Sequence, residues 1–112
     1  MLDESAILNR DSRRDGIFSI MIVYRATNLI TKEVYIGKTI KPLWKRKSDH
    51  KYEAFKRLRP SKFYCALREY GWDNFFWEVI GHSNTYTNLA KLEKKLIVQH
   101  DAIDHGYNTQ IR

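Results

Sequence analysis

Three runs of β-branched and aromatic residues recur along the chain, at 20–28, 32–39 and 74–82. Such residues favour the pleated, partly buried surface of a β-strand. Only a short connector separates the first two runs, so we predict that they pair as an antiparallel hairpin. The third run, with "FFWEVI" at its centre, is so densely apolar that we expect a central or well-covered strand.

Three other segments carry apolar residues at helical intervals and predict α-helices. The first, 42–59, begins with a proline, has a polar face dense in lysine and arginine, and is expected to end at Pro60. The second, 61–71, starts with a serine suited to cap a helix and ends with a glycine. The third, 87–101, has one apolar stripe formed by Leu89, Leu92, Leu96 and Ile97.

The element order ββααβα predicts an α+β fold, a small three-stranded antiparallel sheet flanked by three helices. A chain of 112 residues has the size of one domain, and we assign that domain to 21–112. Residues 1–20 lack clear periodicity and contain Arg10, Arg13 and Arg14. We interpret them as a flexible basic arm, which is either a solvated terminus or a contact to a DNA backbone.

The charge of the chain points to a polyanionic partner. A net charge of +7 and a pI of about 9.6 favour nucleic acid or an anionic membrane surface. No stretch approaches the roughly 20 apolar residues that cross a bilayer, and the acidic, polar start does not resemble a signal peptide. We therefore expect a cytoplasmic protein without a membrane partner. The one cysteine, Cys65, lies among apolar helical residues and is expected in the core.

Aromatic side chains in the second half of the chain have two interpretations. They could stack on nucleic-acid bases, or their dense apolar spacing could place them in the core, which we favour. This group comprises Tyr64, Tyr70, Trp72, Phe75 and Phe76. For Trp44, on the basic helix, packing under the sheet and contact with DNA are both open.

One carboxylate stands within or beside the apolar stripe of the last helix. Glu93 lies between Leu92 and Leu96, so it must pair with a basic side chain, form a salt bridge at the rim, or bind a cation. Mg²⁺ takes one or two protein carboxylates, keeps several waters and uses substrate phosphate as a further ligand. A single inward glutamate in a basic protein suits that arrangement, and the salt bridge remains the alternative.

A second set of residues suggests a site for phosphate. Arg46 and His50 are four residues apart, so both point to one side of the first helix. With Lys38 they would form a cationic wall suited to a scissile phosphate and the charge that develops on it. Gly37, in "VYIGKT", would let the backbone turn close to that phosphate. The alternative is a basic surface that binds no phosphate.

In order and spacing, these residues resemble the GIY-YIG nuclease domain of phage homing endonucleases, some restriction enzymes and the incision subunit of bacterial excision repair. The resemblance runs from about residue 21 to 110. Ile22 replaces the first glycine of the family motif, which affects local packing more than catalysis. The matching segments are "IVY" at 22–24, "ATN" at 26–28, "YIG" at 35–37, "GKT" at 37–39, Arg46 with His50, Glu93, and "GYN" at 106–108.

The resemblance implies a role for each matching residue. Tyr24 and Tyr35 would face the scissile phosphate, and one of them, with Tyr24 favoured, would help to deprotonate the attacking water. Because the pKa of tyrosine is near 10, nearby cations would have to lower it. Arg46 would stabilise the pentacovalent phosphorane. Lys38 and His50 would assist by charge and by orienting water or a tyrosine hydroxyl.

The resemblance also implies a cofactor and an activity. Glu93 would hold one divalent cation per active site, Mg²⁺ or Mn²⁺, and Asn108 would support the site by hydrogen bonding. The implied function is a metal-dependent DNA endonuclease that hydrolyses phosphodiesters by activated water, of homing type or from another phage or bacterial group. The alternatives are a non-catalytic nucleic-acid-binding or regulatory module on the same fold, and a structure-specific nuclease of branched DNA.

Double-stranded DNA is the expected partner, and a homodimer on DNA is one route to double-strand cleavage. Homing relatives usually carry a separate DNA-binding region, and only four residues follow Asn108. We therefore expect a stand-alone catalytic domain whose basic residues contact DNA directly. The residues expected to do so are Lys38, Lys41, Lys45, Arg46 and Lys47.

Overall fold

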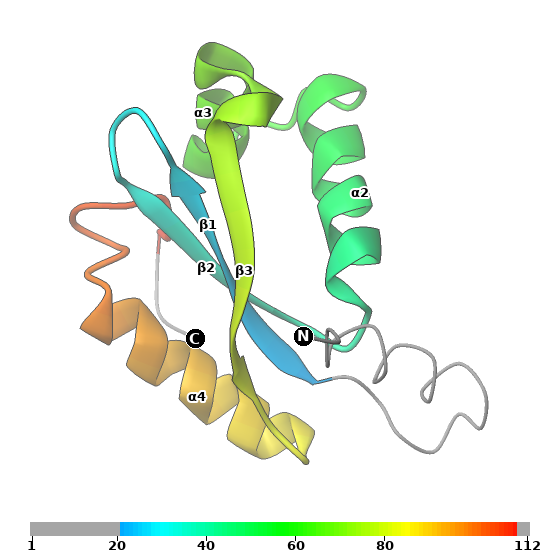
Figure 1. Ribbon diagram of the computed structural model, residues 1–112, viewed down its shortest axis with the longest axis vertical. Coiled ribbons are helices and arrows are strands. Elements are labelled where there is room, and N and C mark those ends of the chain that lie inside the picture. The colour runs from blue at the N-terminus through cyan, green and yellow to red at the C-terminus, as the bar shows by residue number, and fades with distance from the viewer. Residues whose placement is uncertain (1–20, 110–112) are drawn as a thin grey trace, which may run out of the picture.

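The computed structural model describes residues 21–109. The expected basic arm, 1–20, and residues 110–112 lie outside the described part of the chain. The elements follow the predicted order ββααβα, with one 3₁₀ turn before the last strand (Figure 1). They are β1 (Ile22–Asn28), β2 (Val34–Thr39), α2 (Leu43–Phe55), α3 (Lys62–Tyr70), η1 (Trp72–Asn74), β3 (Phe75–His82) and α4 (Tyr86–Gln99).

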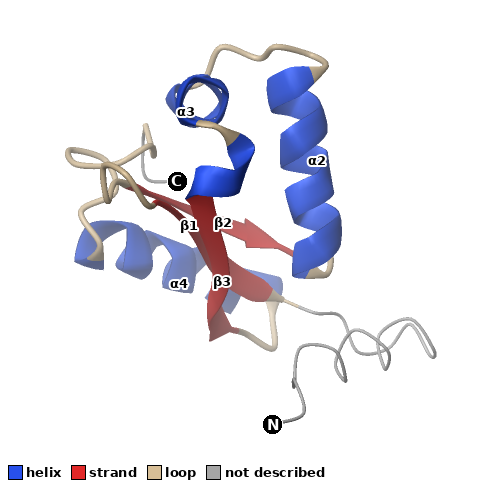
Figure 2. Cartoon of the chain, turned by 45° about the horizontal axis from the view of Figure 1, so that its top comes forward, coloured by secondary structure: helices blue, strands red, loops and turns tan. Residues whose placement is uncertain are grey.

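The three strands form one antiparallel sheet in the order β2-β1-β3, which confirms the α+β prediction. Tyr24 in β1 is paired with Gly37 in β2 and with Val79 in β3, next to a register shift at Val23. Helix α4 covers one face of the sheet, while α2 and α3 lie on the other (Figures 1 and 2). Strand β2 is therefore an edge strand with a helix layer on either side.

Successive residues of each strand point to opposite faces, so the sheet supports two separate cores. Beneath α4 the buried residues are aliphatic. Beneath α2 and α3 they are aromatic residues and alanines with one leucine, and further aromatic rings pack against them. The α4 core contains Val23, Ile36, Leu89, Leu96, Ile97 and Ala102, and the α2/α3 core contains Ala26, Ala54, Phe63, Ala66, Leu67, Phe75 and Tyr107.

The caps of α3 agree with the sequence. The side chain of Ser61 accepts a hydrogen bond from the backbone N–H of Tyr64, as a helix N-cap does. Gly71 follows the last turn with φ of 93°, a conformation that glycine adopts without steric cost. Helix α2, by contrast, ends at Phe55 rather than at Pro60, because the chain leaves the helix through a turn in which Leu58 has φ of 52°.

Three packing predictions are wrong. Strand β3 is an edge strand rather than a central one, because β1 lies between it and β2. On such a strand the neighbours alternate, so Phe75 is buried while Phe76 is 53% exposed. Cys65 is exposed, because the buried positions of α3 are Phe63, Ala66 and Leu67, and Cys65 points away from that face.

Within residues 21–109, no helix combines the length and the apolar character that a membrane crossing requires.

Candidate active site

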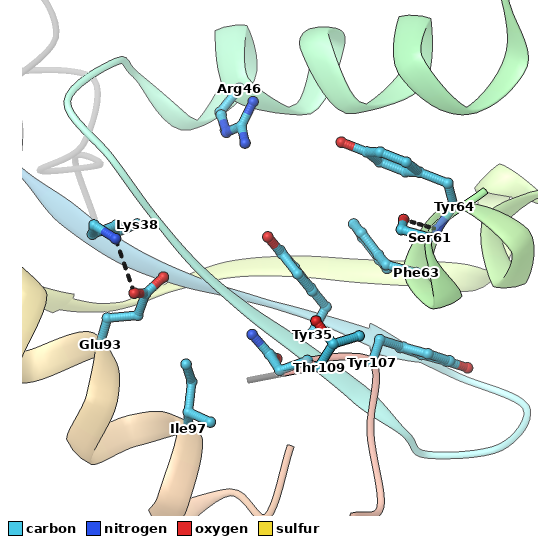
Figure 3. A pocket seen from close by; sticks show the side chains of 11 residues that line it. Tyr35, Lys38, Arg46, Ser61, Phe63, Tyr64, Glu93, Ile97, Tyr107 and Thr109 are labelled. Carbon is cyan, nitrogen blue, oxygen red and sulfur yellow. Dashed lines mark hydrogen bonds and ion pairs between the residues drawn. The ribbon is translucent and has the colours of Figure 1, made fainter. Parts of the chain in front are cut away.

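A polar cavity of about 380 Å³ opens at the outer edge of β2. Side chains from β2, α2, α3, α4 and the segment after α4 line it (Figure 3). Five of the residues expected from the sequence meet there, although they lie far apart along the chain. They are Tyr35, Lys38, Arg46, Glu93 and Asn108.

Lys38 and Glu93 are joined across the cavity by a hydrogen-bonded ion pair. The Nζ atom of Lys38 donates to Oε1 of Glu93 at 3.1 Å (Figure 3). Glu93 is only 9% exposed although it is charged. The apolar stripe of α4 thus brings its one carboxylate to the rim of the core, where the carboxylate has a cationic partner.

Glu93 is also the residue on this wall that could hold a metal. Residues 21–109 contain no group of three histidine, cysteine, aspartate or glutamate side chains close enough to share a metal ion. One carboxylate in a polar cavity does not make a zinc site closed by protein ligands. It does fit Mg²⁺ or Mn²⁺, which take few protein ligands and complete their coordination with waters and phosphate oxygens.

Tyr24 and His50 lie behind the cavity wall, in the interior. Tyr24 is fully buried and His50 is 1% exposed. The hydroxyl of Tyr24 is 2.6 Å from Nε2 of His50, and Nδ1 of His50 is 2.8 Å from the hydroxyl of Tyr64. Because Tyr64 lines the cavity, this chain of hydrogen bonds connects the buried pair with the cavity wall.

Burial decides the protonation of these groups. It is the main cause that raises the pKa of Tyr24 well above its ordinary value and that of Tyr35 to about 12, while the charge of Arg46 acts in the opposite direction. Burial, followed by the charge of Arg46, lowers the pKa of His50 to about 3. His50 is therefore neutral at physiological pH, and the prediction that it adds to a cationic wall is wrong.

Packing holds Tyr35 and Tyr24 in place. The ring of Tyr35 stacks on Phe63 with centroids 4.2 Å apart and planes within 4°. Gly37 makes room for Tyr24, since a Cβ at that position would lie 2.4 Å from the Tyr24 hydroxyl oxygen. In this structure the glycine of "YIG" thus has a packing reason, close to the tyrosine of the neighbouring strand.

Asn108 anchors the C-terminal segment to the free edge of β2. Its side chain accepts from the backbone N–H of Ile36 and donates to the carbonyl oxygen of the same residue, both at 2.8 Å. These bonds take the place of a further strand at that edge. Asn108 thus makes hydrogen bonds beside the cavity, and its supporting role in the reaction stays a prediction.

The basic residues expected to contact DNA do not all lie together, since only Lys38 and Arg46 line the first cavity. Lys41 and Lys45 border a neighbouring cavity of about 620 Å³, where they bond to Asp49 at 2.8 and 3.3 Å. Lys47 lies elsewhere, with its Nζ 5.8 Å from the centroid of the Trp77 ring. Trp44 is 61% exposed and does not pack under the sheet.

Tyr64 is the residue that the sequence did not single out for the site. Its spacing predicts a core aromatic, and its ring does pack against the α2/α3 core. Its hydroxyl, however, points toward the same space as Arg46 and Tyr35 (Figure 3), and Tyr64 borders both cavities. The one available signal was its place next to buried Phe63 in the first turn of α3, where a polar tip can reach solvent.

Comparison with known proteins agrees with this geometry. A family model described as the GIY-YIG catalytic domain matches residues 20–108. The solved catalytic domain of homing endonuclease I-TevI is similar in fold, with a TM-score of 0.72 and 20% identity over 80% of this chain and 98% of that one. A mutant of the catalytic domain of intron endonuclease I-TevI gives a TM-score of 0.74 and 19% identity, over 83% and 96% of the two chains. A search of the curated proteins found no match.

Proposed function

This chain belongs to the GIY-YIG family, and from that premise we propose that it is a divalent-metal-dependent DNA endonuclease that hydrolyses phosphodiester bonds by water attack. Membership of the family supports nuclease activity. The observation that carries the finer proposal is the cavity at the edge of β2, where a carboxylate, an ammonium, a guanidinium and a phenol converge. These groups match what phosphodiester hydrolysis requires.

The cation would be held by Glu93, the one carboxylate on the cavity wall. When bound, Mg²⁺ or Mn²⁺ would neutralise phosphate charge and make a coordinated water more acidic. Lys38 already bonds to this carboxylate at 3.1 Å. Its Nζ therefore lies where a phosphate approaching Glu93 would be within its reach.

Two cationic side chains, one from a strand and one from a helix, would contact the bound phosphate. Lys38 extends from β2 and Arg46 from α2, and both line the cavity. The phosphorane that forms during attack carries more negative charge than the phosphodiester. Fixed cations therefore stabilise the transition state more than the ground state, which accelerates the reaction.

The tyrosine pair would activate the water. Tyr35 presents its ring to the cavity, and Tyr24 lies behind it, with ring centroids 6.3 Å apart. Since burial raises the pKa of both, the phenols are neutral at rest. A proton can leave this pair only when an acceptor takes it, and His50 is hydrogen-bonded to Tyr24.

Double-stranded DNA is the substrate that we propose. Lys41 and Lys45 continue the basic wall beyond Arg46, so the backbone on one side of the scissile phosphate would pass them. One active site would cleave one DNA strand, so a double-strand break would need a homodimer or two successive cleavage events. The solved homing endonuclease domain of similar fold favours a homing-type enzyme.

Glu93→Gln tests this function. Supercoiled plasmid is incubated with wild-type protein in Mg²⁺, in Mn²⁺ and in EDTA, and nicked and linear products are quantified. We expect cleavage only with a metal, and a loss of about 10²- to 10³-fold in the variant, because the metal ligand is gone. The control is Glu69→Gln, an exposed carboxylate on α3 outside the cavity, which should cut like wild type.

Two results would contradict the proposal. If wild type leaves plasmid, linear and branched DNA intact in both metals but still binds them, the chain is a nucleic-acid-binding module on this fold. Cleavage of branched DNA alone would instead identify a structure-specific nuclease.

A further inference from the structure

The hydrogen-bond chain behind the cavity ends at Tyr64, a residue outside the family motif, whose hydroxyl can exchange protons with solvent. Tyr24 and His50 have almost no exposed surface, so neither can exchange a proton with water directly. Tyr64 can, because it borders both cavities while its hydroxyl is 2.8 Å from Nδ1 of His50. The described part of the chain provides no other hydrogen bond to that nitrogen.

A neutral imidazole has one N–H donor and one acceptor nitrogen. If Nε2 accepts the proton of Tyr24, then Nδ1–H donates to Tyr64. His50 cannot keep a second proton, because burial and the nearby Arg46 disfavour the imidazolium and lower its pKa to about 3. A proton that arrives at Nε2 must therefore leave from Nδ1 in the same event.

We propose that Tyr64 is a positioning residue that fixes the tautomer of His50 and passes to solvent the proton that the tyrosine pair releases. This proposal rests on the proposed nuclease function. It assigns Tyr64, which the sequence pattern placed among core aromatics, to the activation of the attacking water.

The proposed relay consists of three coupled proton transfers. The O–H bond of Tyr24 breaks as Nε2–H forms, Nδ1–H breaks as a new O–H bond forms on Tyr64, and the original hydroxyl proton of Tyr64 moves to water in the cavity. His50 stays neutral throughout and changes tautomer. The Tyr24 oxygen is then free to take the proton of Tyr35, which lines the cavity and in turn accepts a proton from the attacking water. The starting tautomer returns after Tyr24 passes a proton through Tyr35 to the leaving oxygen. The Tyr24 oxygen can then take back the Nε2 proton of His50, while Tyr64 gives its proton to Nδ1 and regains one from cavity water.

The charges around this chain are few and identifiable. Arg46 on α2 faces all three groups and favours loss of a proton from each tyrosine. Asp49 on the same helix and Tyr35 on β2 act in the opposite direction, on His50 and on Tyr24 respectively. At the exit, Glu53 raises the pKa of Tyr64, whereas Arg59 lowers it. These neighbours are unchanged in a Tyr64 variant, so a change in its pH profile reports the loss or alteration of the Tyr64 hydroxyl.

The test is the pH dependence of single-turnover plasmid cleavage with Mg²⁺, for wild type and Tyr64→Phe. The variant keeps the ring and its packing and removes one oxygen. We expect the rate to fall by about 10- to 100-fold, in the range of a lost proton-transfer group, with little change in KM and with the rising limb moved to higher pH. The control is Tyr86→Phe, a 58% exposed tyrosine on α4 outside both cavities, which should match wild type.

A second variant and a second readout keep the proposal testable if Tyr64→Phe loses stability. Incorporation of 3,5-difluorotyrosine at position 64 retains the hydroxyl but makes it more acidic, so the rising limb should move to lower pH. Independently of cleavage, ¹⁵N NMR of the His50 ring should show protonated Nδ1 in wild type and a shifted tautomer balance in Tyr64→Phe.

The outcomes separate this inference from the function on which it rests. A wild-type protein that cuts no DNA contradicts the nuclease proposal. A wild-type protein that cuts, with unchanged pH profiles and unchanged His50 ¹⁵N shifts in the Tyr64 variants, overturns the role of Tyr64 and leaves the nuclease proposal intact.

Discussion

The two faces of the sheet are filled with different kinds of side chain. On the α4 face the buried residues are aliphatic, such as Val23, Ile36 and Leu89, and only Glu93 at the rim is charged. On the α2/α3 face aromatic rings surround His50, which with Tyr24 forms a buried polar pair. Both faces have a buried core, but only the α2/α3 face holds a buried, hydrogen-bonded pair of a phenol and an imidazole.

The difference has an energetic cause. Aliphatic groups stabilise the fold in proportion to the area that they bury. A buried hydroxyl or imidazole destabilises it unless a hydrogen bond compensates. The bonds of His50 to Tyr24 and Tyr64 supply that compensation. We infer that the α4 face mainly secures the position of β2, whereas the α2/α3 face holds reactive groups in a defined protonation state.

The largest expected effect on stability is at the aliphatic face. Leu89→Ala removes a fully buried side chain of α4 and should lower the free energy of unfolding by about 2–5 kcal/mol, because a cavity replaces packed atoms. Urea denaturation measures that change. Cleavage per folded molecule should remain close to wild type, since Leu89 does not line the cavity.

An equal loss of cleavage and of folded protein is therefore the expected pattern for Leu89→Ala. A stable Leu89→Ala protein without activity would contradict the division of roles between the two faces.

Gly37→Ala should affect the α2/α3 face. The added Cβ would lie 2.4 Å from the Tyr24 hydroxyl oxygen and 2.9 Å from Cε2 of Tyr35. Either ring must move, which should cost about 1–3 kcal/mol of stability. We expect cleavage to fall more than the folded fraction, because displacement of Tyr24 weakens its bond to His50. Gly81→Ala is a matched control, since the atoms nearest to its Cβ would belong to Leu92 and Leu96 on the α4 side.

For Gly37→Ala, thermal melts and plasmid cleavage are measured on the same samples. Wild-type cleavage despite lower stability would show that the position of Tyr24 is not critical.

The most specific effect, and the smallest per pH unit, is the pH dependence of stability caused by His50. Its pKa is about 3 in the folded protein and near 6.5 in an unfolded chain. Below pH 6.5 the unfolded chain binds a proton that the folded protein does not, so stability falls as pH decreases toward 3. The slope approaches about 1.4 kcal/mol per pH unit.

Urea denaturation at pH 7, 6, 5 and 4 measures this slope. His50→Gln should flatten it, because glutamine does not titrate. His82→Gln, exposed at the end of β3, should leave it unchanged. A slope that persists in His50→Gln would mean that other groups cause the acid sensitivity.

Much of the site could be predicted from local features of the chain. The spacing of Tyr24 and Tyr35 on two strands, the helical register of Arg46 and the place of Glu93 beside an apolar stripe are local properties. The structure brings Tyr35, Arg46 and Glu93 to one cavity. Periodicity predicted the elements because it reflects which residues share a face of one helix or strand.

The sequence by itself determined the order of the elements, the hairpin of β1 and β2, the caps of α3 and the residues that match the family. Tertiary structure decided which of these residues meet solvent. It placed Tyr35 on the cavity wall and Tyr24 behind it, made His50 neutral, exposed Cys65 and connected Tyr64 with the site. The physical reason is that burial and pKa depend on what packs against a residue from distant parts of the chain, and spacing along the sequence does not contain that information.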